Sequence, residues 1–362
     1  MLLGVLFLGP RLPGIAAFTT IDEPFWLHQS SNFYYALGQR DFASTIYAHH
    51  PAVTTMWIIT GALLLYFPEY RALQQGYLKP GKFEGFLASY GKTPLELLEI
   101  SRLIQVVVVV ALLFSAFLLL RRMFGLASAA LAAGMISVSP VFLGHSRILN
   151  HEALLALFLL VAVLGLQVFL SERRWQFLAI SAVAAGLAQL SKSSGLPILP
   201  LGAAMILIDA VTRRSEKART WLLDAARTFG VWLAVMVATY VLFWPGMWIT
   251  PGRLLYEVYG NVLSYAFVGT TLEVLPGLDT SAFRVGGFQA GLSAYLAELA
   301  WRTPLLTWLG LVVALIIFVA GVRLESLRTY RQTIIYSIAL AVAFVLMFSV
   351  QRGRKPPHYI LT

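Results

Sequence analysis

The stretch from Thr20 to Trp57, TIDEPFWLHQSSNFYYALGQRDFASTIYAHHPAVTTMW, is polar and aromatic although apolar segments lie on both sides of it. It carries two adjacent carboxylates, Asp22 and Glu23, and a His-His-Pro sequence that ends at Pro51. The chain around it has 362 residues, of which 59% are hydrophobic and 12% are charged. Its mean hydropathy of +0.76 exceeds that of water-soluble domains, so we expect an all-α, polytopic membrane protein.

Apolar runs long enough to cross a bilayer follow this stretch. The first apolar segment, Met1–Pro10, is only about half of the required length and is closed by Arg11, so the first helix is either clipped or continues to Phe18. Clearer spans are expected at residues 102–120, 124–143, 153–170, 175–190, 195–211, 221–243, 304–321 and 332–350. Together with the first segment they predict about nine transmembrane helices.

The charges in the loops predict the orientation. The loops after residues 120, 172, 212 and 322 carry eleven basic and three acidic residues, whereas segments 19–101 and 244–303 carry slightly more acidic than basic ones. By the positive-inside rule the basic loops face the cytoplasm and the two long segments face outward. Most of the formal charge of +10 lies in these loops, so we exclude nucleic acid as a partner. We expect a protein of the plasma or inner membrane that is surrounded by membrane lipids and has its functional face on the outer side.

Two amphipathic segments are expected to lie in the membrane plane. Residues 52–67 are apolar, but one more crossing there would place Arg121 and Arg122 outside, so we predict an in-plane or re-entrant helix. Residues 253–267 place aromatic and aliphatic side chains at helical spacing and are interpreted in the same way.

The chain divides into three parts on this topology. Residues 1–243 form a membrane module with a large first external loop at 19–101, residues 244–303 form an external loop with an interfacial helix, and residues 304–362 form C-terminal transmembrane helices. There is no cysteine, which excludes disulfides and thiolate metal sites.

Asp22 and Glu23 are the first candidate catalytic residues. A carboxylate at the outer mouth of a helix bundle can accept a proton from a hydroxyl group. The structural alternative is that Asp22 caps a helix that begins at Glu23-Pro24. Both roles can coexist.

Further candidates gather in segments predicted to be external. Arg147 and Glu152 flank Asn150, a plausible cap for the next span, and Glu152 also suits the first turn of that helix. Lys192 lies in a tight turn with Ser193, Ser194 and Pro197, where it either snorkels to the headgroups or binds a lipid phosphate. Arg354 and Lys355 are basic residues on the outer side, which predicts a phosphate-binding role unless the last span is miscounted. All six histidines also fall outside, but no metal-binding motif such as HExxH is present.

These motifs resemble one known family. Asp22-Glu23-Pro24, Trp26 and the run from His50-Pro51 to Trp57 are similar to the first external loop of GT-C glycosyltransferases of the family 39 type. That family includes protein O-mannosyltransferases, bacterial lipid A aminoarabinose transferases and prokaryotic relatives. The resemblance extends over most of the chain, through segments 147–155, 186–193, 244–248 and 355–361.

The chain departs from the family pattern at three points. Glu152 stands where the family usually has Asp, so its carboxylate reaches one methylene further. His358 stands where an Arg is usual. The chain stops at Thr362, where family members continue into further spans, so we expect both ends to be truncated.

The resemblance implies a GT-C type helix bundle that moves a sugar from a polyprenyl phosphate, undecaprenyl or dolichyl, to an acceptor hydroxyl on the external face with inversion. The acceptor would be a protein, a lipid or a glycan. Asp22 matches the family's base, while Glu23 and Glu152 would shape the pocket or hold sugar hydroxyls. Cations would stabilise the leaving phosphate, and the resemblance assigns this role to Lys192, Arg147, His50, Arg354 and Lys355. Aromatic side chains would contact the sugar or the acceptor, and the residues assigned to this role are Trp26, Trp248 and Tyr256.

Two alternatives remain open at this stage. No nucleotide cofactor is expected because the donor is already activated, whereas a divalent metal held by histidines is a minor alternative. A transporter or flippase of an anionic glycolipid would use the same cations only for binding. A carboxylate at Asp22 favours the transferase, because transport of a lipid phosphate has no need of a base.

Overall fold

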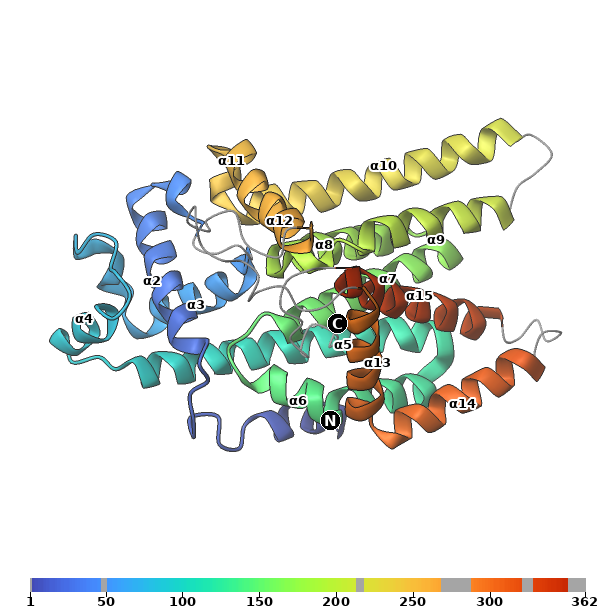
Figure 1. Cartoon of the computed structure of the whole chain (residues 1–362), viewed down its shortest axis with the longest axis horizontal. Helices are drawn as coiled ribbons and strands as arrows, with labels where there is room; N and C mark the ends of the chain where they lie inside the picture. Colours follow the sequence, from blue (N-terminus) through green and yellow to red (C-terminus); the bar gives the residue numbers. More distant parts are fainter. Residues whose placement is uncertain (1, 47–50, 213–217, 268–287, 321–327, 351–362) are drawn as a thin grey trace.

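The computed structural model describes residues 2–46, 51–212, 218–267, 288–320 and 328–350, and all regular structure in these ranges is helical (Figure 1). The helices of the amino-terminal half are α1 (Leu2–Leu8), α2 (Glu23–Gln39), α3 (Val53–Tyr66), α4 (Phe83–Ser89), α5 (Pro94–Val138) and α6 (Pro140–Arg147). Those of the second half are α7 (Glu152–Glu172), α8 (Trp175–Ser191), α9 (Ile198–Thr212), α10 (Ala218–Phe243), α11 (Pro251–Leu255), α12 (Asn261–Phe267), α13 (Phe288–Arg302), α14 (Leu305–Ala320) and α15 (Arg328–Val350).

The described part of the chain has five helices long and apolar enough to cross a membrane, or six if the bent pair α13–α14 is counted as one span. They comprise α5, α7, α10, the segment Ser193–Thr212 that ends with α9, and most of α15. Helix α8 is apolar but has only 17 residues. The chain is therefore an all-helical, multi-pass membrane protein, whereas the expected total of about nine crossings is not reached by length and composition alone.

Helix α5 accounts for part of this difference, because it contains two of the expected spans. Its helical geometry is broken at Gly125, where φ is 78° and ψ is 177°, a conformation open almost only to glycine. Phe7 of α1 packs on Phe114 before the break, with ring centroids 5.0 Å apart, and Leu6 O accepts a hydrogen bond from Ser137 after it. Both limbs thus lie beside one short helix, and the ribbon turns back after its first limb (Figure 1).

The amino-terminal helix is shorter than either alternative from the sequence. Helix α1 ends at Leu8, and a 3₁₀ turn over Gly9–Arg11 follows it. The Arg11 guanidinium is fully buried and donates hydrogen bonds to Phe7 O (2.6 Å) and to Ser137 Oγ (3.0 Å). These acceptors compensate for the burial of a charge in an apolar environment.

Helix α7 lies at the centre of the bundle. Its 21 residues are almost all buried, since α5, α8 and α9 pack against it. A helix of this length extends over about 32 Å, close to the thickness of the hydrocarbon core. At its carboxyl end Glu172 pairs with Arg122 (2.9 Å), beside the basic residues of the neighbouring turns. Glu152 marks its other end, so α7 separates the two ends of the bundle.

Helices α2, α3 and α4 gather beyond the Glu152 end (Figure 1). Helix α3 has 14 residues and is about 21 Å long, too short to span a bilayer, as expected for an in-plane or re-entrant segment. It packs against α2, α5 and α8. The segment expected to be helical at 253–267 is also helical, with a π turn at Tyr256–Gly260 between α11 and α12.

Candidate functional site

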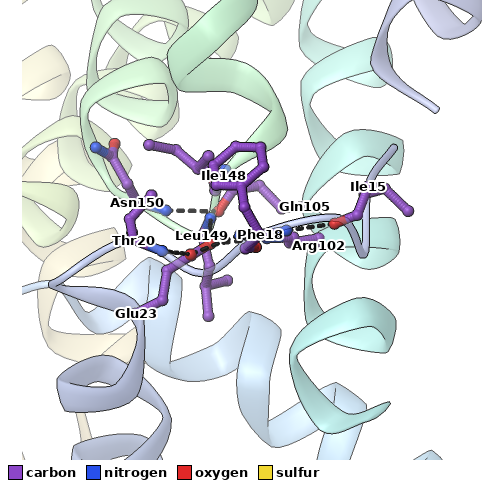
Figure 2. A network of polar contacts seen from close by, with 9 residues as sticks. All are labelled: Ile15, Phe18, Thr20, Glu23, Arg102, Gln105, Ile148, Leu149 and Asn150. Atoms are coloured by element: carbon purple, nitrogen blue, oxygen red, sulfur yellow. Dashed lines mark hydrogen bonds and ion pairs between the residues drawn. The ribbon is translucent and has the colours of Figure 1, made fainter. Parts of the chain in front are cut away.

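The Glu23 carboxylate organises one end of the bundle through a buried network (Figure 2). Arg102 of α5 donates two hydrogen bonds to it, from Nε to Oε1 (2.8 Å) and from Nη2 to Oε2 (2.6 Å). The backbone N–H groups of Thr20 (2.7 Å) and Leu149 (2.8 Å) donate to the same carboxylate. One side chain therefore joins the chain before α2, helix α5 and the loop that leads to α7.

Burial alone would raise the pKa of Glu23. The hydrogen bonds from Arg102, Thr20 and Leu149 and the positive charge of Arg102 outweigh this effect and lower the pKa below its ordinary value. Glu23 is therefore held as a carboxylate, and its oxygens are occupied by the network.

Arg102 has further partners that fix the preceding loop. Its Nη2 donates to Phe18 O (2.8 Å), its Nη1 to Ile15 O, and its guanidinium lies 5.1 Å from the centre of the Phe18 ring. Gln105, one turn further along α5, donates to Ile148 O (2.5 Å) and accepts from Asn150 N (3.3 Å). The loop at 148–150 is thus held on α5 by two hydrogen bonds of the Gln105 side chain.

Glu152 and Lys192 form the second part of the site. Lys192 Nζ lies 2.5 Å from Glu152 Oε1, and the two residues are only 2% and 3% exposed. Helix α7 begins at Glu152, whose N–H donates to Asn150 Oδ1 (2.6 Å). The capping position itself is His151, one residue after the cap expected from the sequence, and its side chain makes no capping hydrogen bond. Lys192 directly follows the last residue of α8. Glu152 and Lys192 thus form a buried ion pair, a contact that the sequence analysis does not predict.

His151 connects this ion pair to α2. Its Nε2 lies 3.8 Å from Glu152 Oε1, and its ring packs edge-on against Trp26, with centroids 5.2 Å apart. Trp26 is buried one turn after Asp22. The short α2 turn that carries Asp22 and the pair Glu152–Lys192 therefore lie at the same end of the molecule.

Asp22 itself is exposed to solvent, and its side chain makes no hydrogen bond or ion pair with another described residue. It occupies the residue before α2, as the cap hypothesis requires, but its side chain does not cap the helix. The proposed capping role is therefore wrong, because the Asp22 backbone is already helical (φ −85°, ψ −22°) and only its carbonyl bonds to the next turn, at Trp26 N (3.1 Å). The carboxylate is left open to solvent.

The amino end of α3 meets the carboxyl end of α8 next to Lys192. Thr54 Oγ1 and Ser191 Oγ share a hydrogen bond of 2.8 Å. Trp57, one turn along α3, donates its indole N–H to Phe243 O at the end of α10 (2.7 Å). The start of α3 therefore lies beside the Lys192 turn, whereas His50 lies outside the described residues.

The other predicted site residues are placed as follows. Arg147 donates to Pro13 O and is half-buried at the end of α6. Trp248 is half-exposed, donates to Val241 O (2.8 Å) and packs against Phe42, and Tyr256 is exposed on the π turn. Tyr259 on the same turn donates to Gln189 Oε1 (3.0 Å), and this hydrogen bond joins the π turn to α8. Arg354 and Lys355 lie outside the described residues.

The structure contributes residues that the sequence reading did not identify, chiefly Arg102, Gln105 and His151. A signal was available for the first two: a basic and an amide residue three positions apart, near the start of an otherwise apolar span, commonly mark a polar site. Among the residues that the structure describes, no group of three or more His, Asp or Glu side chains could hold a metal ion.

A protein-family comparison covers the central helices of this arrangement. The family model described as dolichyl-phosphate-mannose-protein mannosyltransferase matches residues 98–245, which include Arg102, Glu152 and Lys192. Asp22 and Glu23 precede the matched region. A comparison with individual curated proteins found no match. Residues 98–245 are thus similar to the family of dolichyl-phosphate-mannose-protein mannosyltransferases, which take their sugar from a lipid phosphate.

Proposed function

We propose that the protein transfers a sugar from a polyprenyl phosphate to an acceptor hydroxyl at the outer face of the membrane, with inversion at the anomeric carbon. The observation that carries this proposal is the buried pair Glu152–Lys192, which lies inside the family-matched region and is connected through His151 and Trp26 to the α2 turn with the open Asp22 carboxylate. A cation and a base at one end of a helix bundle are what transfer from a lipid phosphate requires.

The proposed orientation rests on the two ends of α7. Arg122, Arg173 and Arg174 gather around Glu172 and Asp209 at one end, whereas Glu152 and Lys192 lie at the other. The positive-inside rule then places Lys192 on the outer side. We further propose that both limbs of α5, α8 and α14 cross the membrane in addition to α7, α9, α10 and α15, which makes eight crossings in the described part of the chain. Helix α1, with seven residues, is too short to make the ninth crossing that the sequence predicts.

Lys192 is the proposed first ligand of the donor phosphate. As the bond between the anomeric carbon and the phosphate oxygen breaks, that oxygen gains negative charge, so a nearby ammonium group stabilises the transition state more than the ground state. Glu152 would hold the Lys192 side chain in place before the donor arrives, and the phosphate would then share Lys192 Nζ with it. Arg147, His50, Arg354 and Lys355 are proposed as further phosphate ligands.

Asp22 is the proposed general base. The acceptor hydroxyl oxygen attacks the anomeric carbon on the face opposite the phosphate, its proton passes to Asp22, and the bonding electron pair leaves with the polyprenyl phosphate. Asp22 suits this role because no bond to another described residue occupies its carboxylate oxygens. Glu23 next to it is saturated by its network, so we assign it a positioning role rather than contact with the reacting atoms.

Three aromatic residues are proposed to contact the sugar or the acceptor. Trp26 is buried next to His151, close to the ion pair, whereas Trp248 and Tyr256 are exposed on the segment that covers this end. Aromatic rings combine apolar faces with polar edges, which suits the alternating C–H and hydroxyl surfaces of sugars.

The test uses the full chain, purified and supplied with a fluorescent polyprenyl-phosphate sugar. Asp22→Asn should lower sugar transfer by about 10²- to 10⁴-fold, the usual contribution of a general base, while donor binding stays nearly unchanged. Glu84→Gln, at an exposed acid on α4, is the control and should leave transfer intact.

Two results would argue against the proposal. Transfer at the parental rate in Asp22→Asn would remove the base assignment. Movement of the intact donor across a vesicle membrane without loss of its sugar would favour a flippase, the second function that the same cations could serve.

A further inference from the structure

A pocket of about 600 Å³ lies at the end of the bundle opposite Lys192, between α7, α8, α9 and α10. Its wall carries two basic residues, two acidic residues and two tryptophans: Arg173, Arg227, Asp209, Asp224, Trp175 and Trp221. The charges of this wall sum to zero. None of these residues belongs to the transfer site proposed above.

The two sides of the pocket differ in how their charges are used. Arg173 pairs with Asp209 of α9, and its guanidinium lies 5.7 Å from the centre of the Phe169 ring. The Arg173 backbone has a positive φ of 59°, a conformation that favours glycine, although the residue there is an arginine. This side of the pocket is therefore fixed by contacts within the protein.

The α10 side offers groups for a ligand. Asp224 and Arg227 are exposed, lie three residues apart on one helix face, and form no ion pair with another described residue. Trp221, one turn earlier, has a buried indole nitrogen that makes no hydrogen bond within the described part of the chain. A negatively charged group that accepts hydrogen bonds would suit Arg227 and the Trp221 indole N–H. A positively charged group that donates hydrogen bonds would suit the Asp224 carboxylate.

We propose that this pocket binds the headgroup of a zwitterionic aminophospholipid, with the phosphate on Arg227 and Trp221 Nε1 and the primary ammonium on Asp224. A lipid is favoured over a soluble molecule because apolar side chains such as Phe169, Ile206 and Ala225 line the same pocket. Tryptophan and arginine are also the side chains that commonly lie at headgroup level. An anionic lipid would leave Asp224 facing a negative ligand, and a choline lipid has no N–H to donate to it.

The test measures lipid binding to the purified, delipidated full chain by native mass spectrometry. Phosphatidylethanolamine should bind about tenfold more tightly than phosphatidylglycerol or phosphatidylcholine, the effect of one charge-assisted hydrogen bond. Asp224→Asn should remove this preference and leave phosphatidylglycerol binding unchanged or stronger, whereas Arg227→Gln should weaken all three lipids. The double substitution Glu298→Gln with Arg302→Gln removes a similar acid–base pair on α13 and is the matched control.

Three outcomes would overturn the proposal. Phosphatidylglycerol could bind the parental protein as well as phosphatidylethanolamine, or Asp224→Asn could retain the preference. Soluble phosphoethanolamine could bind as tightly as the diacyl lipid, which would identify the site as one for a small soluble molecule. Because the readout is lipid binding, none of these results depends on the transfer reaction.

Discussion

Lys192 Nζ and Glu152 Oε1 lie 2.5 Å apart although 40 residues separate them, and water reaches neither side chain to any extent. Removing one member of such a pair leaves an uncompensated buried charge, which typically costs about 3–5 kcal/mol. Lys192→Met should therefore lower the thermal unfolding midpoint strongly, and Lys192→Met combined with Glu152→Gln should restore most of it. Transfer should remain lost in both variants. A double variant as unstable as the single one would show that the pair is not energetically coupled.

The network of Glu23 predicts how stability depends on pH. Because the folded-state pKa of Glu23 is lowered from 4.5, its contribution is fully present above that value and is lost as the pH falls further. Unfolding midpoints measured between pH 7 and pH 3 should therefore decline at the acid end in the parental protein, and Glu23→Gln should flatten part of this decline. Glu84→Gln on the exposed side of α4 serves as the control. An unchanged acid slope in Glu23→Gln would contradict the assignment.

Close packing of α8 on α10 requires a glycine at position 186. A Cβ built there would lie 2.7 Å from Met236 O and 2.8 Å from Thr239 Cβ, both on α10. Gly186→Ala should force the two helices apart and destabilise the protein by about 1–3 kcal/mol, as overpacking usually does. Gly230→Ala on α10, where a Cβ meets nothing within 4 Å, should not lower stability, since alanine favours the helix. Equal unfolding midpoints for both variants would refute the packing argument.

The hydrogen bond from Tyr259 to Gln189 joins the π turn Tyr256–Gly260 to α8. Gln189 lies three residues before Lys192. Tyr259→Phe should remove this hydrogen bond, which contributes about 1 kcal/mol to the free energy that holds the two segments together. The KM for the acceptor should rise several-fold, with a smaller effect on kcat. Steady-state kinetics with Tyr90→Phe, an exposed tyrosine after α4, provide the comparison. Unaltered acceptor kinetics in Tyr259→Phe would mean that this bond has no part in acceptor binding.

The helices were largely predictable because their signals are local. The apolar run at 221–243 became the membrane-spanning part of α10. Asn150 accepts a hydrogen bond from the first N–H of α7, although it lies one residue before the capping position. The expected span from residue 102 instead begins at Pro94, since Thr93 caps the helix there by accepting a hydrogen bond from Glu96 N (3.3 Å). The sequence pattern predicts a loop for the polar residues at the start of this apolar run, whereas they form the first turns of α5.

The partners of the site residues were not predictable from local patterns. Glu23 meets Arg102 across 79 residues, and Lys192 meets Glu152 across 40, and nothing near either residue in the sequence marks these pairings. Asp22 and Glu23 are adjacent and chemically alike, yet one is open to solvent and the other is buried in a network. That difference arises from the direction in which each side chain leaves the first turn of α2, which only the packing of α5 and the 148–150 loop decides.

The reversal at Gly125 also bears on how this chain assembles. Its two limbs are neighbours in sequence, so they can pair while the ribosome is still producing the rest of the molecule, and α1 is already available to pack beside both. Contacts that close over a short loop form early and cost little chain entropy. A helical hairpin would then be in place as a template before the segment bearing Lys192 is synthesised.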